Sequence, residues 1–192
     1  AYDCQVFAFD PTPKAKAYMK NRSMMSEKLH FQEIGLWHEE DIVRFYHHSN
    51  PKSPSYSIVN LHKTDTFVEA TCKRLSTIMQ ENRHCRIDLL KLDIEGAEYR
   101  VLDSIVEDCL DVSIILVEFD EIHSKLYHGY RDRIKKSIHQ LCDYGYTLVA
   151  LRAKSNYTFV KKDILLSYLR SHRKEYLPTN CPDSVVYEPS HL

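Results

Sequence analysis

The fold of this chain is decided by residues 87–98, which read Ile87-Asp88-Leu89-Leu90-Lys91-Leu92-Asp93-Ile94-Glu95-Gly96-Ala97-Glu98. A short and nearly continuous apolar run predicts a strand that is buried on both faces of a sheet. The run ends on acidic residues and a glycine, and a helical pattern begins directly after them. Because ligands of open α/β sheets bind outside the carboxyl ends of the strands, we expect Asp93 and Glu95 to lie at the functional site.

The segments on both sides of this stretch alternate between strand-like and helix-like patterns. Strands are predicted at residues 6–9, 31–36, 42–46, 56–60, 66–72, 87–92, 112–119, 146–151 and 157–160. Helices are predicted at residues 14–19 and 75–80, after Gly96, and around residues 134–141, where Gly145 supplies a left-handed stop. The alternation predicts an α/β fold whose mostly parallel sheet is covered on both faces, closed by a C-terminal antiparallel hairpin.

Length and composition limit the classes of protein to consider. The 192 residues suit one domain, which we expect at residues 1–177, followed by an irregular proline-bearing tail at residues 178–192. A formal net charge of -1 argues against a nucleic-acid partner that is bound through charge. No stretch approaches the ~20 apolar residues of a membrane span, and no export signal is visible. The sequence therefore predicts a globular protein without a membrane span.

The six cysteines predict neither a metal centre nor a redox pair. Their spacings are wide and irregular, and none forms a Cys-x-x-Cys pair. Cys109 and Cys142 follow helical patterns and are expected to pack as small apolar side chains. We interpret the thiols as reduced and the protein as intracellular, in the cytoplasm, although an even number of cysteines also permits disulfides.

Acidic residues follow three of the predicted strands. Asp10 ends the first strand, where a carboxylate can accept hydrogen bonds from two ribose hydroxyls, although Asp-Pro is also typical of a turn. Asp93 and Glu95 follow the strand at residues 87–92, where Glu95 could simply favour the positive end of the next helix. Glu118, Asp120, Glu121 and His123 end the strand at residues 112–119.

If the second and third of these strands are neighbours, up to four carboxylates gather at one edge of the sheet. Crowded like charges raise one another's pKa values or recruit a cation, so a general base and a divalent metal site are both conceivable. Acidic residues also end strands without any function. The remaining histidines, including His47, His48 and His128, lack the spacing of metal ligands, and we assign no metal.

Residues 88–98 resemble the signature Asp-Leu-Leu-Lys-Ile-Asp-Val-Glu-Gly-Ala-Glu of the FkbM-type family of S-adenosylmethionine-dependent methyltransferases. Residues 6–13 resemble that family's second strand and its ribose-binding acid, and residues 115–119, 144–146 and 156–160 add weaker matches in the same order. The similarity runs from residue 6 to residue 162. The resemblance implies a Rossmann-like class I methyltransferase fold and O-methyl transfer to a hydroxyl of a sugar or natural-product substrate.

The resemblance also assigns roles to individual residues. Asp10 would bind the ribose of the cofactor, and Gly35 and Leu36 would border its adenine. Asp93 would lie near the methionine end of S-adenosylmethionine and, with Glu95, would face the reacting methyl group. A carboxylate there could orient or deprotonate the accepting hydroxyl.

One part of the family pattern is missing from this sequence. The chain has four glycines and no glycine-rich loop, and the family's first strand is not found. That strand would lie between the strands at residues 6–9 and 87–92, and its loss would leave backbone groups unpaired on both sides. We therefore expect the C-terminal portion of a longer methyltransferase, which alone binds cofactor poorly. The alternatives are a catalytically inactive remnant or interaction module, and another Rossmann-like enzyme that uses a nucleotide.

Overall fold

A computed structural model describes residues 3–20, 26–50, 53, 55–60, 62–120 and 129–172. The predicted tail at residues 178–192, together with Glu121, His123 and His128, lies outside the described residues. The elements are β1 (Val6–Phe9), α1 (Pro13–Lys20), β2 (Leu29–Gln32), β3 (Gly35–Leu36), β4 (Asp41–His47), β5 (Tyr56–Ser57), β6 (Phe67–Lys73), α2 (Leu75–Glu81), β7 (Ile87–Leu92), α3 (Glu98–Glu107), β8 (Val112–Glu118), α4 (Tyr130–Asp143), β9 (Tyr146–Arg152), β10 (Asn156–Lys161) and α5 (Lys162–Ser171).

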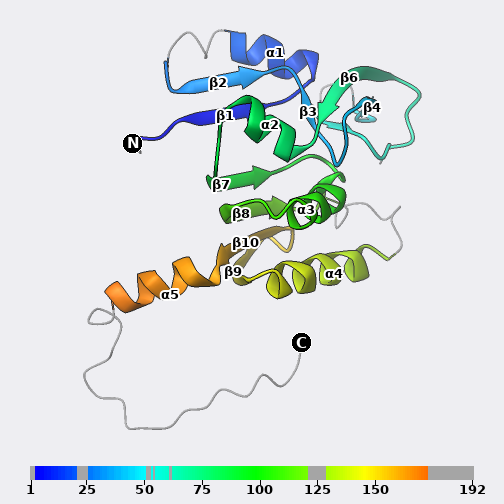
Figure 1. Ribbon diagram of the computed structural model, residues 1–192. Helices are drawn as coiled ribbons and strands as arrows, with labels where there is room; N and C mark the ends of the chain where they lie inside the picture. Colours follow the sequence, from blue (N-terminus) through cyan, green and yellow to red (C-terminus); the bar gives the residue numbers. More distant parts are fainter. Residues whose placement is uncertain are drawn as a thin grey trace.

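The described strands form three sheets and not the single sheet that the alternation predicts. β1 and β2 are parallel, the second sheet has the order β7-β8-β10-β9, and the third has the order β3-β6-β4-β5 (Figure 1). β7 and β8 are parallel, whereas β10 is antiparallel to both β8 and β9. The mixed α/β fold and the C-terminal antiparallel hairpin are therefore confirmed.

The third sheet exists because the predicted strand at residues 31–36 is divided in two. Its first part, β2, pairs with β1, and its second part, β3, pairs with β6. Glu33 and Ile34 lie between the two strands and belong to neither sheet. An apolar pattern does not reveal a change of partner within one extended segment, so the sequence predicted a single strand.

The main core lies between helices α3 and α4 and the β7-β8-β10-β9 sheet. Ala97, directly before α3, recurs with Val101 and Ile105 of the helix at every fourth position. All three residues are fully buried, as predicted. Val101 and Ile105 belong to a cluster to which β8, α4 and the hairpin also contribute. Gly145, after α4, has φ +103°, which confirms the predicted left-handed stop.

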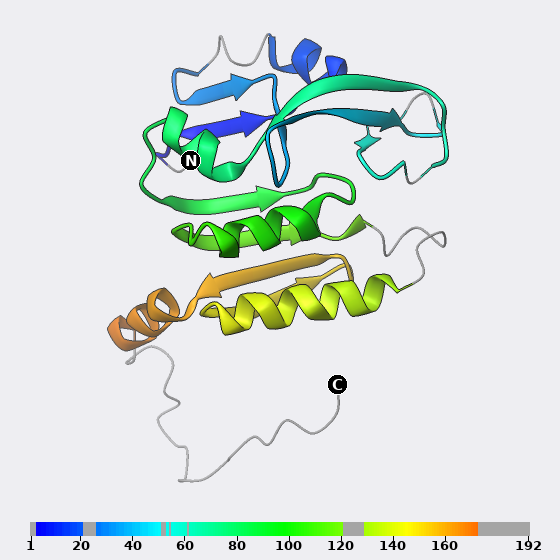
Figure 2. The same ribbon diagram turned by 45° about the vertical axis from the view of Figure 1, so that its right-hand side comes forward.

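The two helices lie on the same face of this sheet (Figure 2), which corrects the prediction of cover on both faces. On the opposite face, Leu89 of β7 is 53% exposed, and Ile114 and Leu116 of β8 are only partly buried. The prediction that residues 87–92 are buried on both faces is therefore wrong. β7 is an edge strand among the described residues, because it pairs with β8 alone. β8, between β7 and β10, and β10, between β8 and β9, are the enclosed strands of this sheet.

Two further observations concern the cysteines and the helices. Cys4, Cys72, Cys85, Cys109 and Cys142 are free, and Cys181 lies outside the described residues. Cys109 is exposed and has φ +51°, so the prediction that it packs as an apolar side chain is wrong. Helix α5, which the sequence did not predict, buries no residue. Within the described part of the chain, no helix combines the length and the apolar character needed to cross a bilayer.

Candidate functional site

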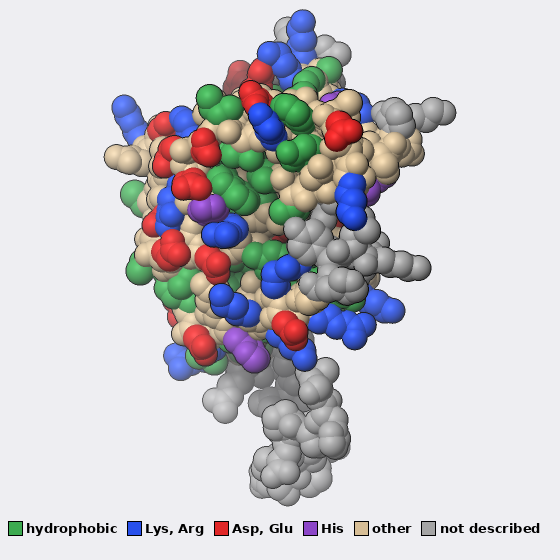
Figure 3. Space-filling model, turned by 90° about the vertical axis from the view of Figure 1, so that its right-hand side faces the viewer, with side chains coloured by type: hydrophobic (Ala, Val, Ile, Leu, Met, Phe, Trp, Pro, Cys, Tyr) green, Lys and Arg blue, Asp and Glu red, His purple; other side chains and the backbone are tan. Residues whose placement is uncertain are grey.

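Three acidic segments lie at the same edge of the molecule. β1, β7 and β8 point in the same direction, so their carboxyl ends face the right-hand side of Figures 1 and 2. Asp10 follows β1, Asp93 follows β7, and Asp120 follows β8 by two residues. Figure 3 views the molecule onto this edge, where acidic and basic side chains are intermixed over apolar surface.

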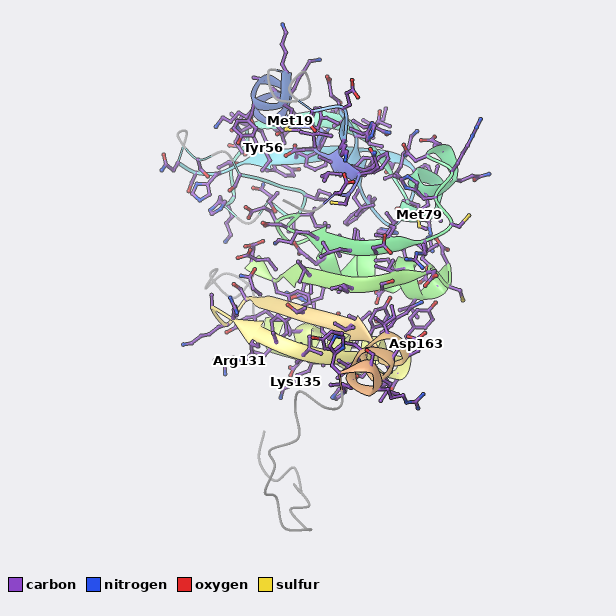
Figure 4. The ribbon with its side chains drawn as sticks, turned by 90° about the vertical axis from the view of Figure 1, so that its left-hand side faces the viewer. Met19, Tyr56, Met79, Arg131, Lys135 and Asp163 are labelled. Atoms are coloured by element: carbon purple, nitrogen blue, oxygen red, sulfur yellow. The ribbon has the colours of Figure 1, made fainter. Side chains whose placement is uncertain are left out.

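Strand β5 lies near Asp10 and is hydrogen-bonded to the loop after β7. The pKa of Tyr56 is raised, first by burial and then by the negative charge of Asp10. The neighbouring Ser57 donates a hydrogen bond from Oγ to the backbone carbonyl of Glu95 at 2.5 Å. In Figure 4, Tyr56 lies in the half of the molecule that contains β1, whereas Arg131 and Lys135 of α4 lie at the other end. Tyr56 therefore lies near the predicted ribose-binding acid, and the next residue, Ser57, is hydrogen-bonded to the predicted catalytic loop.

The loop between β7 and α3 has an unusual backbone conformation. Glu95 has φ +53° and Gly96 has φ +101°. Glu98 accepts the N–H of Ile94 at Oε1 and the N–H of Gly96 at Oε2, each at 2.9 Å. Glu98 is completely buried, and burial raises its pKa to about 8, while these backbone bonds act in the opposite direction. The role predicted for Glu95 depends on this loop.

The carboxylates of the two neighbouring strands gather as expected. Lys91 of β7 lies between them, with its Nζ 3.2 Å from Asp93 Oδ2 and 3.5 Å from Glu118 Oε2. Ser155 Oγ donates to Glu118 Oε1 at 3.3 Å. Because Lys91 and Asp93 are both close to half exposed, this ion pair contributes little stability. The ammonium group of Lys91 therefore lies close to one acid after β7 and to one acid at the end of β8.

Asp120 is the acid whose environment the sequence did not reveal. Burial raises its pKa to about 7, and the charges of Glu95, Asp93 and Glu118 act in the same direction. Its Oδ2 atom is buried and has no hydrogen-bond partner among the described residues. A carboxyl group with a pKa near 7 can accept and release a proton at neutral pH. This property makes Asp120 a candidate general base beside Glu95.

Histidines of the segment between β4 and β6 also approach this edge. The rings of His48 and His62 have centroids 3.7 Å apart. Burial and the neighbouring His48 lower the pKa of His62, while Glu95 acts in the opposite direction. The sequence gave no signal for His62 or for Ser57, because their contacts with Glu95 join residues more than 30 positions apart. Within the described residues, no three side chains are arranged to bind a metal ion.

Gly35 and Leu36, the predicted adenine neighbours, have packing roles in this structure. A Cβ atom on Gly35 would lie 2.5 Å from Cys72 Sγ and 2.9 Å from the Phe45 ring, so the site accommodates only glycine without rearrangement. Leu36 packs against the main core. Contact of either residue with adenine stays a prediction.

A shallow depression lies elsewhere, on the surface of α3 and α4. It encloses about 730 Å³ and is lined by Val106, Asp132, Lys135, Lys136, His139, Gln140, Asp143 and Tyr144. None of the acids that follow β1, β7 and β8 borders it. The chemical groups therefore favour the acidic edge as the functional site, because the acids that follow the three strands gather there and not at the depression.

Comparison with known proteins identifies this sequence as a methyltransferase domain. The model of the methyltransferase FkbM domain matches residues 1–148, and the chain belongs to this family. The resemblance of residues 88–98 to the FkbM signature is thereby confirmed. A search of curated proteins found no match.

One solved structure illustrates the similarity. The crystal structure of methyltransferase FkbM from Methylobacillus flagellatus KT is similar to 81% of this chain, with 12% identity and a TM-score of 0.40. The chain covers 36% of that protein, so it spans about a third of its length.

Proposed function

We propose that this chain takes part in the transfer of a methyl group from S-adenosylmethionine to a hydroxyl of a sugar or natural-product substrate. The observation that carries the proposal is that β5 lies near Asp10 and is hydrogen-bonded to the Asp93–Gly96 loop, in a member of the FkbM methyltransferase family. The common direction of β1, β7 and β8 supports a Rossmann-like class I arrangement. The proposed domain extends over residues 1–177. The proposed location of the protein is the cytoplasm.

The residues at this edge suit the chemical groups of the cofactor. Asp10 Oδ1 accepts the N–H of Thr12 at 2.8 Å, which fixes the carboxylate. No described residue donates a hydrogen bond to its second oxygen, which would bind the ribose hydroxyls. When bound, S-adenosylmethionine supplies an electrophilic methyl group on a positively charged sulfur. Asp93 and Glu95 offer negative charge to that end of the cofactor.

The accepting hydroxyl must lose its proton as the methyl group is transferred. Asp93 and Glu95 would orient this hydroxyl, and Asp120 would take up its proton because the pKa of Asp120 is raised to about 7. The buried Oδ2 of Asp120 lacks a partner, so it has capacity for a hydrogen bond from a substrate. Water is partly excluded here by Tyr56 and Ser57 of β5, which are both buried.

The experiment compares Asp10→Ala and Asp93→Ala in the protein that carries this chain. Asp10→Ala should weaken affinity for S-adenosylhomocysteine, the demethylated cofactor, by about tenfold, because a hydrogen-bonded carboxylate is lost. Asp93→Ala should reduce turnover more than it reduces cofactor affinity. Asp132→Ala, an exposed acid on α4, is the control. Calorimetry and transfer of a labelled methyl group provide the two measurements.

Equal and small effects of the two substitutions would contradict the proposal, because neither acid would then lie in the site. Normal cofactor binding without methyl transfer to any hydroxylated acceptor would favour an inactive module. Preferential binding of a dinucleotide or nucleotide sugar would favour the other Rossmann-like enzyme.

A further inference from the structure

The loop after β7 is held at three backbone atoms. From the core side, Glu98 accepts the N–H groups of Ile94 and Gly96, and these two bonds bracket Glu95. From the outer side, Ser57 Oγ donates to the carbonyl of Glu95. The conformation needs such support, since Glu95 has a left-handed φ of +53° that non-glycine residues adopt only at a cost in free energy.

Glu98 has a rigid base for this task. It is the first residue of α3, and Val101, Leu102 and Ile105 fix that helix in the main core. Its side chain is fully buried. An acid in the first turn of a helix can interact with the positive end of that helix, and the carboxyl group of Glu98 in addition accepts hydrogen bonds from the loop that precedes the helix.

We propose that Glu98 is a positioning residue, whose two hydrogen bonds hold the Asp93–Gly96 loop so that Asp93 and Glu95 face the reacting groups. The inference rests on the proposed methyl transfer at this edge. Glu98 itself touches neither cofactor nor substrate in this account. Its effect on binding and turnover passes through the backbone of Ile94 and Gly96.

The test uses Glu98→Gln, which preserves the size of the side chain but replaces one accepting oxygen with a donating amide. Asp103→Asn on the same helix is the matched control, because Asp103 makes no hydrogen bond to the loop in the structure. Amide hydrogen exchange is measured at Ile94 and Gly96, with Leu102 and Ile105 of α3 as reporters of global opening. Affinity for S-adenosylhomocysteine is measured by titration at concentrations up to millimolar.

In Glu98→Gln, exchange at Ile94 and Gly96 should accelerate by about tenfold relative to Leu102 and Ile105, as expected for the loss of one buried hydrogen bond. Affinity for S-adenosylhomocysteine should fall by about fivefold or more. Asp103→Asn should change neither quantity. Glu98→Asp, which retains the carboxylate on a shorter side chain, should recover part of the loop protection.

Equal acceleration at all four amides would overturn the inference, because Glu98 would then stabilise the whole domain and not the loop. Unchanged affinity in Glu98→Gln, with the parent protein binding normally, would also overturn it. If the protein with Glu98 unchanged does not bind S-adenosylhomocysteine, the proposed function is contradicted. An exchange effect confined to Ile94 and Gly96 would then show that Glu98 holds the loop without acting on cofactor binding.

Discussion

A buried carboxylate that lacks a hydrogen bond destabilises a folded protein, and Asp120 is in this position at Oδ2. Its pKa is raised to about 7, from an ordinary value near 3.8. Between these values the unfolded chain has lost the proton while the folded protein retains it. The folded state therefore binds more protons in this window, and stability falls as the pH rises from about 4 to 7. Proteins retain such unfavourable groups where function requires them.

This argument predicts the effect of Asp120→Asn on stability. The substitution removes the titrating group, so the stability of the variant relative to the parent should increase by about 1–2 kcal/mol between pH 5 and pH 8, after allowance for solvent screening. Glu98 also has a raised pKa, and the charge of Asp120 adds to that shift, so the substitution lowers the pKa of Glu98 and changes stability in the same direction. Urea unfolding at the two pH values measures the difference. A constant difference would show that Asp120 titrates normally, and turnover by the variant at the parent's rate would exclude it as the general base.

The sequence predicted which residues lie at this edge better than it predicted their pKa values and their contacts. Asp93 and Glu95 were located because they follow an apolar run and precede a helix, which is local information. The raised pKa of Asp120 depends on burial and on charges in the loop after β7, 25 or more positions away. The contact of Ser57 with Glu95 likewise depends on how the β4–β6 segment returns to β7. Such long-range contacts leave no trace in spacing or composition.

At the scale of elements, the helix patterns were reliable, whereas strand partners were not. Ala97, Val101 and Ile105 form a buried stripe because helical periodicity is set within one segment. The exposure of β7 depends on its having a neighbour on one side only, among the described strands. The division of residues 31–36 between β2 and β3 depends on pairing with β1 and β6. Helix α5 was missed because it has no buried stripe.

The packing between β3 and β6 gives a test of the role of Gly35. In Gly35→Ala, the new methyl group would overlap Cys72 Sγ and the Phe45 ring, so unfolding free energy should fall by about 1–3 kcal/mol. Adding Cys72→Ala should recover part of this loss, because the nearest atom is removed. Cys85→Ala, at an exposed cysteine, is the control for thiol removal. Unchanged stability together with weaker cofactor affinity would instead support the predicted contact with adenine.

At the scale of the whole molecule, three sheets and their connections bring distant segments to one edge. β1 and β7 belong to different sheets, and β5 belongs to the third. The two residues of β5 nevertheless reach both sides, because the charge of Asp10 acts on Tyr56 and Ser57 donates a hydrogen bond to Glu95. The segment between β4 and β6 therefore does more than connect strands, since it joins the two halves of the proposed site.

The most direct measurement is a map of amide chemical shifts during titration with S-adenosylhomocysteine, up to millimolar concentration so that weak binding is detected. The account predicts that amides of Asp10 and Thr12 shift together with those of Ile94, Glu95 and Gly96, with a common dissociation constant. Shifts confined to one of these segments, shifts centred on the α4 depression, or no shift in either segment would contradict a shared cofactor site.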